Sequence, residues 1–214
     1  MKMSKVLPIP FNTDMVRAIL DGLKGATRRI VKGFIPDDAI WGYTAFTPKG
    51  YISCRGTFAD GYGEKFFKLP CKPGDILYVR ETVWQKVGHY LDVDGETKPS
   101  WYKEFKYTAT YEKPETGWNY SWAKRPSIHM PKEAVRIWLK VKDVRVERLQ
   151  DMDYKDAMKE GIDPRLCINR NHTVVKFQKL WNSTIKKSDL DRYGWDANPY
   201  VWVIEFERCE KPAD

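Results

Sequence analysis

The feature that most constrains the fold is the longest predicted β-strand, residues 135–149, in which the apolar face changes halfway. Leu139 and Val141 share one parity. Val144 and Val146 share the other. Because residues of one parity lie on one face of a strand, the switch predicts a bulge or a sharp bend within this run. Small barrels need such bends at their corners, so the pattern favours a small β-barrel.

The other periodic segments alternate between helix and strand patterns. Helices are predicted from Asn12 or Thr13 to Gly22, from Asp151 to Gly161 and over residues 173–185, and strands over residues 27–32, 75–81 and 200–209. Strand, helix, strands, helices and a closing strand in this order are typical of an α+β domain. With 214 residues, 42% of them hydrophobic, the chain can bury a sizeable core. We therefore predict one domain over residues 1–214, a small barrel with flanking helices.

Two aromatic-rich segments, at about residues 33–70 and 88–124, interrupt this pattern. In the first, aromatic side chains lie between glycines and prolines. Since so many rings would not stay in water, we predict hairpins or another ordered insertion there rather than a linker. The second segment has an irregular pattern with one strand signal at residues 104–111. Residues 124–131, with two prolines and a basic pair, predict a rigid loop.

Composition argues against several classes of protein. The four cysteines form no Cys-x-x-Cys pair and the three histidines are scattered, so no zinc site is predicted. No nucleotide-phosphate loop and no metal or cofactor motif occurs, and we predict no cofactor. No apolar run approaches the ~18 residues of a membrane helix. No apolar stretch of signal-peptide length follows the N-terminus, so we expect a cytoplasmic protein without a membrane partner.

The charge balance favours an anionic partner. Lys and Arg outnumber Asp and Glu by 37 to 29, which gives a formal net charge of +8. Such a balance fits binding to nucleic acid, either RNA or single-stranded DNA, or to a nucleoside. The alternative is a basic protein whose charge serves solubility alone.

Two short motifs carry the candidate chemistry. Residues 22–29 read Gly-Leu-Lys-Gly-Ala-Thr-Arg-Arg and contain Lys24 and Thr27. Residues 73–81 form a predicted strand that ends in Glu81. If the fold brings the motifs together, a base, a nucleophile and an acid share one basic cleft. The alternative is a lysine–glutamate ion pair that pins the corner between helix and strand.

The parity of the second motif predicts where its carboxylate points. Leu77 and Val79 share parity with Glu81, so Glu81 faces the core if they do. A carboxylate buried alone is costly and needs a partner. A salt bridge to a nearby lysine or arginine is therefore the structural alternative to catalysis at this position.

Candidate binding residues are cations or flat rings near these motifs. They are Arg28, Arg29, Arg80, Trp84, Trp122, Arg125 and His129. Arg28 and Arg29 are adjacent in a predicted strand and must point to opposite faces. Arg29 shares parity with Thr27, so we favour Arg29 for the cleft. Either tryptophan could stack a base, as in readers of single strands, although most tryptophans belong to a core.

Together with residues 125–131, 144–149 and 198–204, the two motifs resemble the ASCH family, most closely its phage and prophage branch. The likeness spans most of the chain and leaves out the two insertions. It implies a PUA-like fold, which is a small β-barrel with flanking helices and a cleft. Related PUA-like domains bind RNA or modified bases. Some small bacterial members are similar to amidohydrolases that deacetylate N-acetylcytidine.

In those enzymes a lysine, a threonine three residues on and a later glutamate form the catalytic group. The matching positions here are Lys24, Thr27 and Glu81. Hydrolysis of an amide needs a deprotonated nucleophile, a stabilised oxyanion and a proton for the leaving amine. Lys24 serves as the base only if burial or nearby cations lower its pKa.

Three functions follow as hypotheses. The first is an amidohydrolase acting on an N-acylated cytidine. The second is a non-catalytic module that binds RNA, single-stranded DNA or a modified base, with a ribonuclease as its variant. The third is a phage accessory protein that binds another protein. The net charge and the aromatic-rich insertions do not discriminate between the second and the third hypothesis.

Overall fold

The computed structural model of the chain describes residues 4–91 and 97–212. It is a mixed α+β structure with 40% strand and 24% helix in three sheets, which confirms the predicted class. Over the described residues no closed barrel is found, so the closed cylinder expected from the sequence is not observed. The described helices are too short or too polar to cross a membrane.

Contacts along the chain divide it into two compact units, which we describe one at a time. The first is built from Met1–Gly22, Ile76–Leu139 and Arg208–Asp214, so far as these are described. The second consists of Leu23–Asp75 and Lys140–Glu207. The chain thus passes from one unit to the other several times. A single domain over the whole chain stays a prediction.

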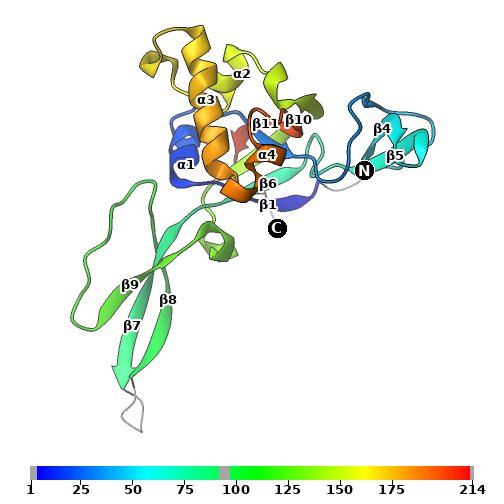
Figure 1. Cartoon of the computed structure of the whole chain (residues 1–214). Helices are drawn as coiled ribbons and strands as arrows, with labels where there is room; N and C mark the ends of the chain where they lie inside the picture. Colours follow the sequence, from blue (N-terminus) through cyan, green and yellow to red (C-terminus); the bar gives the residue numbers. More distant parts are fainter. Residues whose placement is uncertain (1–3, 92–96, 213–214) are drawn as a thin grey trace. The chain divides into compact units, whose positions relative to one another are not determined.

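The first unit contains one helix, several strands and two short 3-10 turns. Its elements are β1 (Val6–Pro10), α1 (Thr13–Leu20), β6 (Ile76–Arg80), β7 (Val83–Leu91), β8 (Thr97–Tyr107), β9 (Tyr120–Arg125), η1 (Ser127–His129), η2 (Lys132–Ala134) and the start of β10 (Trp138–Arg148). β1 pairs in parallel with β6. β7 is the central strand of a three-stranded sheet and is antiparallel to both β8 and β9 (Figure 1). The second insertion is therefore a regular sheet rather than an irregular stretch, and Lys124 and Arg125 end a strand.

Local sequence accounts for the ends of α1 and for the buried face of β6. The Asn12 side chain caps α1 by accepting a 2.8 Å hydrogen bond from the Met15 N–H. Gly22 follows the helix with a φ of +74°, a conformation that glycine adopts without strain. Leu77 and Val79 of β6 are buried, as their parity predicts.

The second unit holds the other helices and a second three-stranded sheet. Its elements are β2 (Ala26–Ile30), β3 (Ile40–Gly42), β4 (Tyr51–Phe58), β5 (Gly61–Lys68), most of β10, η3 (Leu149–Asp151), α2 (Tyr154–Lys159), η4 (Pro164–Leu166), α3 (Arg170–Thr184), η5 (Lys187–Asp189), α4 (Leu190–Tyr193) and most of β11 (Tyr200–Cys209). β2 pairs antiparallel with β11. The β4–β5 hairpin, with β3 on its other side, confirms the hairpin predicted for the first insertion.

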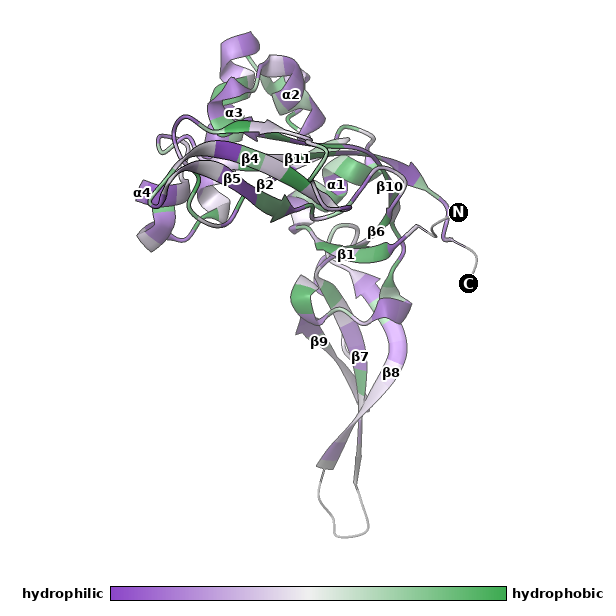
Figure 2. Cartoon of the chain, turned by 90° about the vertical axis from the view of Figure 1, so that its right-hand side faces the viewer, coloured by the Kyte–Doolittle hydropathy of each residue, from purple (hydrophilic) through white to green (hydrophobic). Residues whose placement is uncertain are grey.

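The core of the second unit joins β2, β11, η3, α2 and α3. Buried apolar side chains of this core are Leu149, Met152, Ala157, Phe177, Trp181, Val201 and Val203. Phe177 and Trp181 are spaced one turn apart on α3, whose hydrophobic and hydrophilic positions are interspersed (Figure 2). Along β10, burial changes parity between Val141 and Val144, as the sequence predicts.

Candidate functional site

Lys24 is one of the buried residues among the predicted site residues. It lies between α1 and β2, and its side chain is 0% exposed. Its Nζ donates a 2.7 Å hydrogen bond to Glu160 Oε2 and a 2.8 Å bond to the Glu160 carbonyl oxygen. Glu160 follows the last residue of α2, and Gly161, with a φ of +99°, turns the chain there. The helix end thus presents both a carboxylate and a carbonyl to the lysine.

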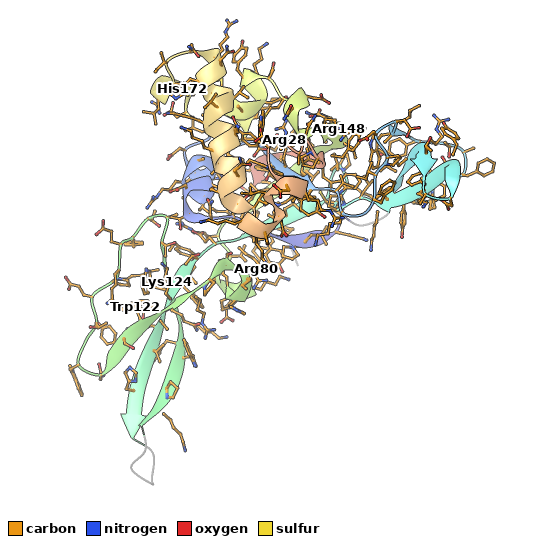
Figure 3. The ribbon with its side chains drawn as sticks, viewed as in Figure 1. Arg28, Arg80, Trp122, Lys124, Arg148 and His172 are labelled. Carbon is orange, nitrogen blue, oxygen red and sulfur yellow. The ribbon has the colours of Figure 1, made fainter. Side chains whose placement is uncertain are left out.

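Arg28 joins the same carboxylate from β2. Its guanidinium donates to Glu160 Oε1 at 3.3 Å and to Glu147 Oε2 at 3.4 Å, and pairs with Asp156 Oδ2 at 3.3 Å. It also lies over the Phe177 ring of α3, 5.9 Å from the ring centroid. Arg28 is labelled in Figure 3. We call Lys24, Arg28, Glu147, Asp156 and Glu160 the buried ion cluster.

The buried ion cluster holds a lysine whose pKa lies below its ordinary value. Desolvation is the largest cause, because an ammonium group is disfavoured away from water. The charge and hydrogen bond of Glu160 raise the pKa of Lys24, whereas nearby Arg28 and Arg29 lower it further. Burial prevails in this balance. A lysine of this kind can release its proton more readily and then act as a base.

Thr27 lies on β2 and is 1% exposed. The Arg29 Nη1 donates a 2.8 Å hydrogen bond to Thr27 Oγ1, so the two side chains lie on one face, as their parity predicts. A cationic donor on a hydroxyl oxygen favours negative charge on that oxygen. The arrangement therefore suits a hydroxyl that reacts or that holds a reacting water.

Glu81 belongs to the first unit and is also buried, with 1% of its surface exposed. Arg136 binds it with two parallel bonds, Nε to Oε1 at 2.9 Å and Nη2 to Oε2 at 3.0 Å. The same guanidinium lies 3.8 Å from the centroid of the Tyr107 ring. Within its own unit Glu81 thus forms the salt bridge to an arginine that we gave as the alternative to catalysis. A catalytic role for Glu81 stays a prediction.

Sequence reasoning did not find the acidic half of the buried ion cluster. Glu160 is separated from Lys24 by 136 positions, so no spacing rule joins them. The available signal was local, since Glu160 directly precedes the glycine at the predicted helix end. A carboxylate at that position faces the negative end of the helix dipole, which calls for a cation partner. Glu147 and Asp156 carry no comparable signal.

The remaining candidate residues lie in the first unit. Arg80 Nη2 donates to the carbonyl oxygens of Ile128 and Met130, and so holds the segment that contains the exposed His129. Arg125 lies at the end of β9 with its guanidinium 4.0 Å from the Trp101 ring centroid. Figure 3 labels Arg80 and two side chains of β9.

Trp84 and Trp122 lie on neighbouring strands of the β7–β8–β9 sheet. Trp84 is half-buried on β7 and lies opposite Lys124 of β9. Trp122 is only 8% exposed, and its Nε1 donates to the Glu115 carbonyl oxygen at 3.0 Å. Its ring is therefore largely covered, which leaves little of it for stacking on a base.

Metal ligation finds no support in the described part of the chain. Over these residues no group of three or more His, Cys, Asp or Glu side chains is placed to hold a metal ion. The cysteines are free thiols, and burial raises the pKa of Cys54 to about 11 and that of Cys71 to about 12. These two thiols are protonated at neutral pH and are poor nucleophiles.

Comparison with known proteins adds no family assignment. No protein-family model, no curated protein and no solved structure matches this chain. The likeness to the ASCH family therefore stays a prediction from the motifs.

Proposed function

We propose that this chain is an ASCH-type, PUA-like protein that binds a nucleoside and hydrolyses the amide of an N-acylated cytidine at Lys24 and Thr27. The observation that carries the proposal is the complete burial of Lys24 with a lowered pKa. A surface lysine would stay charged at neutral pH and could not take up a proton. The net charge of +8 also suits a phosphorylated or oligonucleotide form of the substrate.

The reaction uses the side chains in the following order. Lys24 acts from the fraction of molecules in which its amine has lost its proton, a fraction that the lowered pKa increases. That amine takes the proton from the Thr27 hydroxyl, or from a water that this hydroxyl holds, as the oxygen attacks the acyl carbon. Arg29, which donates to Thr27 Oγ1, favours negative charge on the attacking oxygen as its proton leaves. The carbon–nitrogen bond then breaks, and the leaving exocyclic amine receives the proton from the lysine ammonium. If Thr27 attacks, an acetyl-Thr27 ester remains, and a water that gives its proton to Lys24 hydrolyses it to acetate and restores the hydroxyl. If the held water attacks, acetate and cytidine form directly.

Two parts of this proposal come from the motif resemblance. One is the PUA-like relationship, which the α+β class accommodates. The other is the participation of Glu81 as the third catalytic residue. Glu160 is a carboxylate that neither motif contains. It accepts a hydrogen bond from Lys24 Nζ and holds the lysine in place in the proposed reaction.

The test is release of acetate from N-acetylcytidine by the purified chain and its variants. We expect Lys24→Ala and Thr27→Ala to lower turnover at least ~100-fold, because each removes a group used in proton transfer or attack. Lys32→Ala is the matched control, since Lys32 is an exposed lysine just after β2. Retention of turnover in Lys24→Ala would refute the catalytic assignment.

A folding defect must be separated from a catalytic one, because Lys24→Ala leaves Glu160 buried without its lysine. The double variant Lys24→Gln/Glu160→Gln keeps a hydrogen-bonded pair without charge, and we expect it to fold and to lack turnover. If the wild type binds N-acetylcytidine but releases no acetate, the site is a non-catalytic reader of a modified base. That outcome would replace the enzyme by the second hypothesis.

A further inference from the structure

One face of the β7–β8–β9 sheet in the first unit combines lysines with aromatic rings. We define the Lys–aromatic face as Trp84, Lys86, Tyr102, Lys106, Tyr120, Trp122 and Lys124. Trp84 on the central strand lies opposite Lys106 on one side and Lys124 on the other. Lys86 lies opposite Trp122. Cations and rings therefore lie opposite one another across the strands.

The rings hold the three ammonium groups in place. Lys86 Nζ lies 4.5 Å from the centroid of Tyr120 and 5.7 Å from that of Tyr102. Lys106 Nζ lies 5.0 Å from the centroid of Trp122. These distances are within the ~6 Å range of cation–π attraction, and Lys124 lies 5.7 Å from Trp84.

The face has more positive than negative charge. Glu104 pairs with Lys86 at 2.9 Å. Among the residues that the structure describes, neither Lys106 nor Lys124 forms an ion pair with a carboxylate. Two ordered cations with aromatic rather than acidic neighbours thus remain available to an anion from outside.

A half-exposed ring lies on the same face as these cations, next to Lys86. Tyr102 is 48% exposed and packs against Gly88 of β7, where a Cβ would come within 2.6 Å of the ring. The absence of a side chain at Gly88 is what lets the ring lie on the sheet. A ring fixed in this way can stack on a flat partner at a small entropic cost.

We propose that the Lys–aromatic face binds single-stranded nucleic acid, with phosphates at Lys106 and Lys124 and a base stacked on Tyr102. Regularly spaced anions complement the lysines, and only an unpaired strand offers its bases for stacking on a ring. A duplex would supply the phosphates but not the bases. The inference goes beyond the proposed function, because it uses no residue of the second unit.

Binding is measured by fluorescence anisotropy with labelled oligouridine and oligothymidine strands of about twelve nucleotides, a length within the usual site size. We expect Lys106→Met/Lys124→Met to weaken binding about tenfold and to reduce the slope of log K against log salt by about 1.4, the value for two phosphates of a single strand. Lys186→Met/Lys187→Met is the matched control, because it removes the same charge from two exposed positions of the second unit. We expect this control to keep the wild-type slope.

A second variant tests stacking apart from charge. Tyr102→Leu should weaken binding several-fold, whereas Tyr102→Phe should bind like the wild type, because only the ring is needed. Tyr102 is half-exposed, so both variants should fold, which their thermal unfolding checks. A preference for either the oligouridine or the oligothymidine strand supports the proposal and identifies which of the two strands is favoured.

Several results would overturn the inference. One is binding to neither strand. Another is an equal loss of affinity in the two double-lysine variants. A third is binding of duplex DNA as tight as that of single strands, and a fourth is displacement of the strands by polyglutamate at equal charge, which would indicate an acidic protein as the partner.

Discussion

Lys24 in the second unit and the lysines of the Lys–aromatic face in the first unit have different surroundings: Lys24 is enclosed with carboxylates, and the others lie over aromatic rings. In the buried ion cluster of the second unit, Lys24 is enclosed among carboxylates with no exposed surface. On the Lys–aromatic face of the first unit, Lys106 and Lys124 lie over aromatic rings and remain accessible. Enclosure lowers the pKa of Lys24, and a lowered pKa is what proton transfer requires. The comparison shows that the surroundings of a lysine set its pKa and its access to solvent, and the two proposed roles, as a base and as a positive charge, rest on that difference.

The surroundings of Arg136 combine a carboxylate partner, as in the buried ion cluster, with an aromatic ring, as on the Lys–aromatic face. It binds the buried Glu81 carboxylate with two bonds, as cations do in the cluster. It also lies over the Tyr107 ring, as cations do on the Lys–aromatic face. Three substitutions therefore test whether the surroundings of a cation set its energetic role: one in the buried ion cluster, one at Arg136 and one on the Lys–aromatic face.

The largest effect is expected for Lys24→Ala. Removing the lysine takes two short hydrogen bonds from the buried Glu160 and leaves a cavity, so the free energy of unfolding should fall by about 3 to 5 kcal/mol. Urea unfolding measures it. Lys32→Ala, at an exposed position, should change stability by less than about 0.5 kcal/mol. A loss under about 1 kcal/mol for Lys24→Ala would show that the lysine is not an enclosed partner of Glu160.

An intermediate effect is expected for Arg136→Ala. The Glu81 carboxylate would lose two charge-assisted hydrogen bonds while staying buried, which should reduce stability by about 2 to 3 kcal/mol. Arg136→Lys, measured by the same urea unfolding, should recover part of the loss, because it restores the charge but not the paired geometry. Equal stability of the alanine variant and the wild type would mean that water reaches Glu81 and replaces the arginine.

The smallest effect is expected for Lys86→Met. The variant loses a cation–π contact and an exposed ion pair with Glu104, together worth about 0.5 to 1 kcal/mol. Lys103→Met on β8 is the control, since Lys103 is largely exposed and pairs with Glu133 only at 3.7 Å. Thermal unfolding at two salt concentrations should show a larger loss for Lys86→Met at low salt. A loss as large as that of Lys24→Ala would end the distinction between the two units.

Much of the local structure could be predicted, because periodicity and caps are local signals. The parity of Leu77 and Val79 predicts that Glu81 is buried, and it is. Asn12 and Gly22 mark the ends of α1. The α+β class follows from the order of these elements.

The strands of the β7–β8–β9 sheet could not be predicted from the sequence, because the residues on its Lys–aromatic face are not uniformly polar. Strand prediction depends on alternation between polar and apolar residues. On this face the outward positions hold tryptophan and tyrosine as well as lysine, so the alternation disappears. The expected strand at residues 104–111 was only the end of β8.

The partners in the candidate site could not be predicted, because they depend on tertiary contacts. The motifs identify Lys24 and Glu81 as charged residues in need of partners. The partners observed within each unit are Glu160 and Arg136, which neither motif contains. Spacing in the sequence cannot identify an ion pair across 136 positions.

The pH dependence of stability follows from the same enclosure. The folded-state pKa of Lys24 is lowered, so the unfolded chain binds more protons between that pKa and the ordinary value of 10.5. Stability contributed by this group therefore rises with pH across that window. The variant Lys24→Gln/Glu160→Gln should lack this contribution. The free energy of unfolding in urea, measured at several pH values for the variant and the wild type, isolates it as the difference between the two pH dependences.

The most direct test of the account is an NMR titration of the Lys24 side chain, observed at its Cε and Nζ nuclei in the folded protein. Comparison with Lys24→Gln/Glu160→Gln assigns the signal. The account predicts a midpoint clearly below 10.5, because desolvation outweighs the attraction of Glu160. A midpoint at or above 10.5 would show that Glu160 keeps the lysine charged, and would contradict its role as a base.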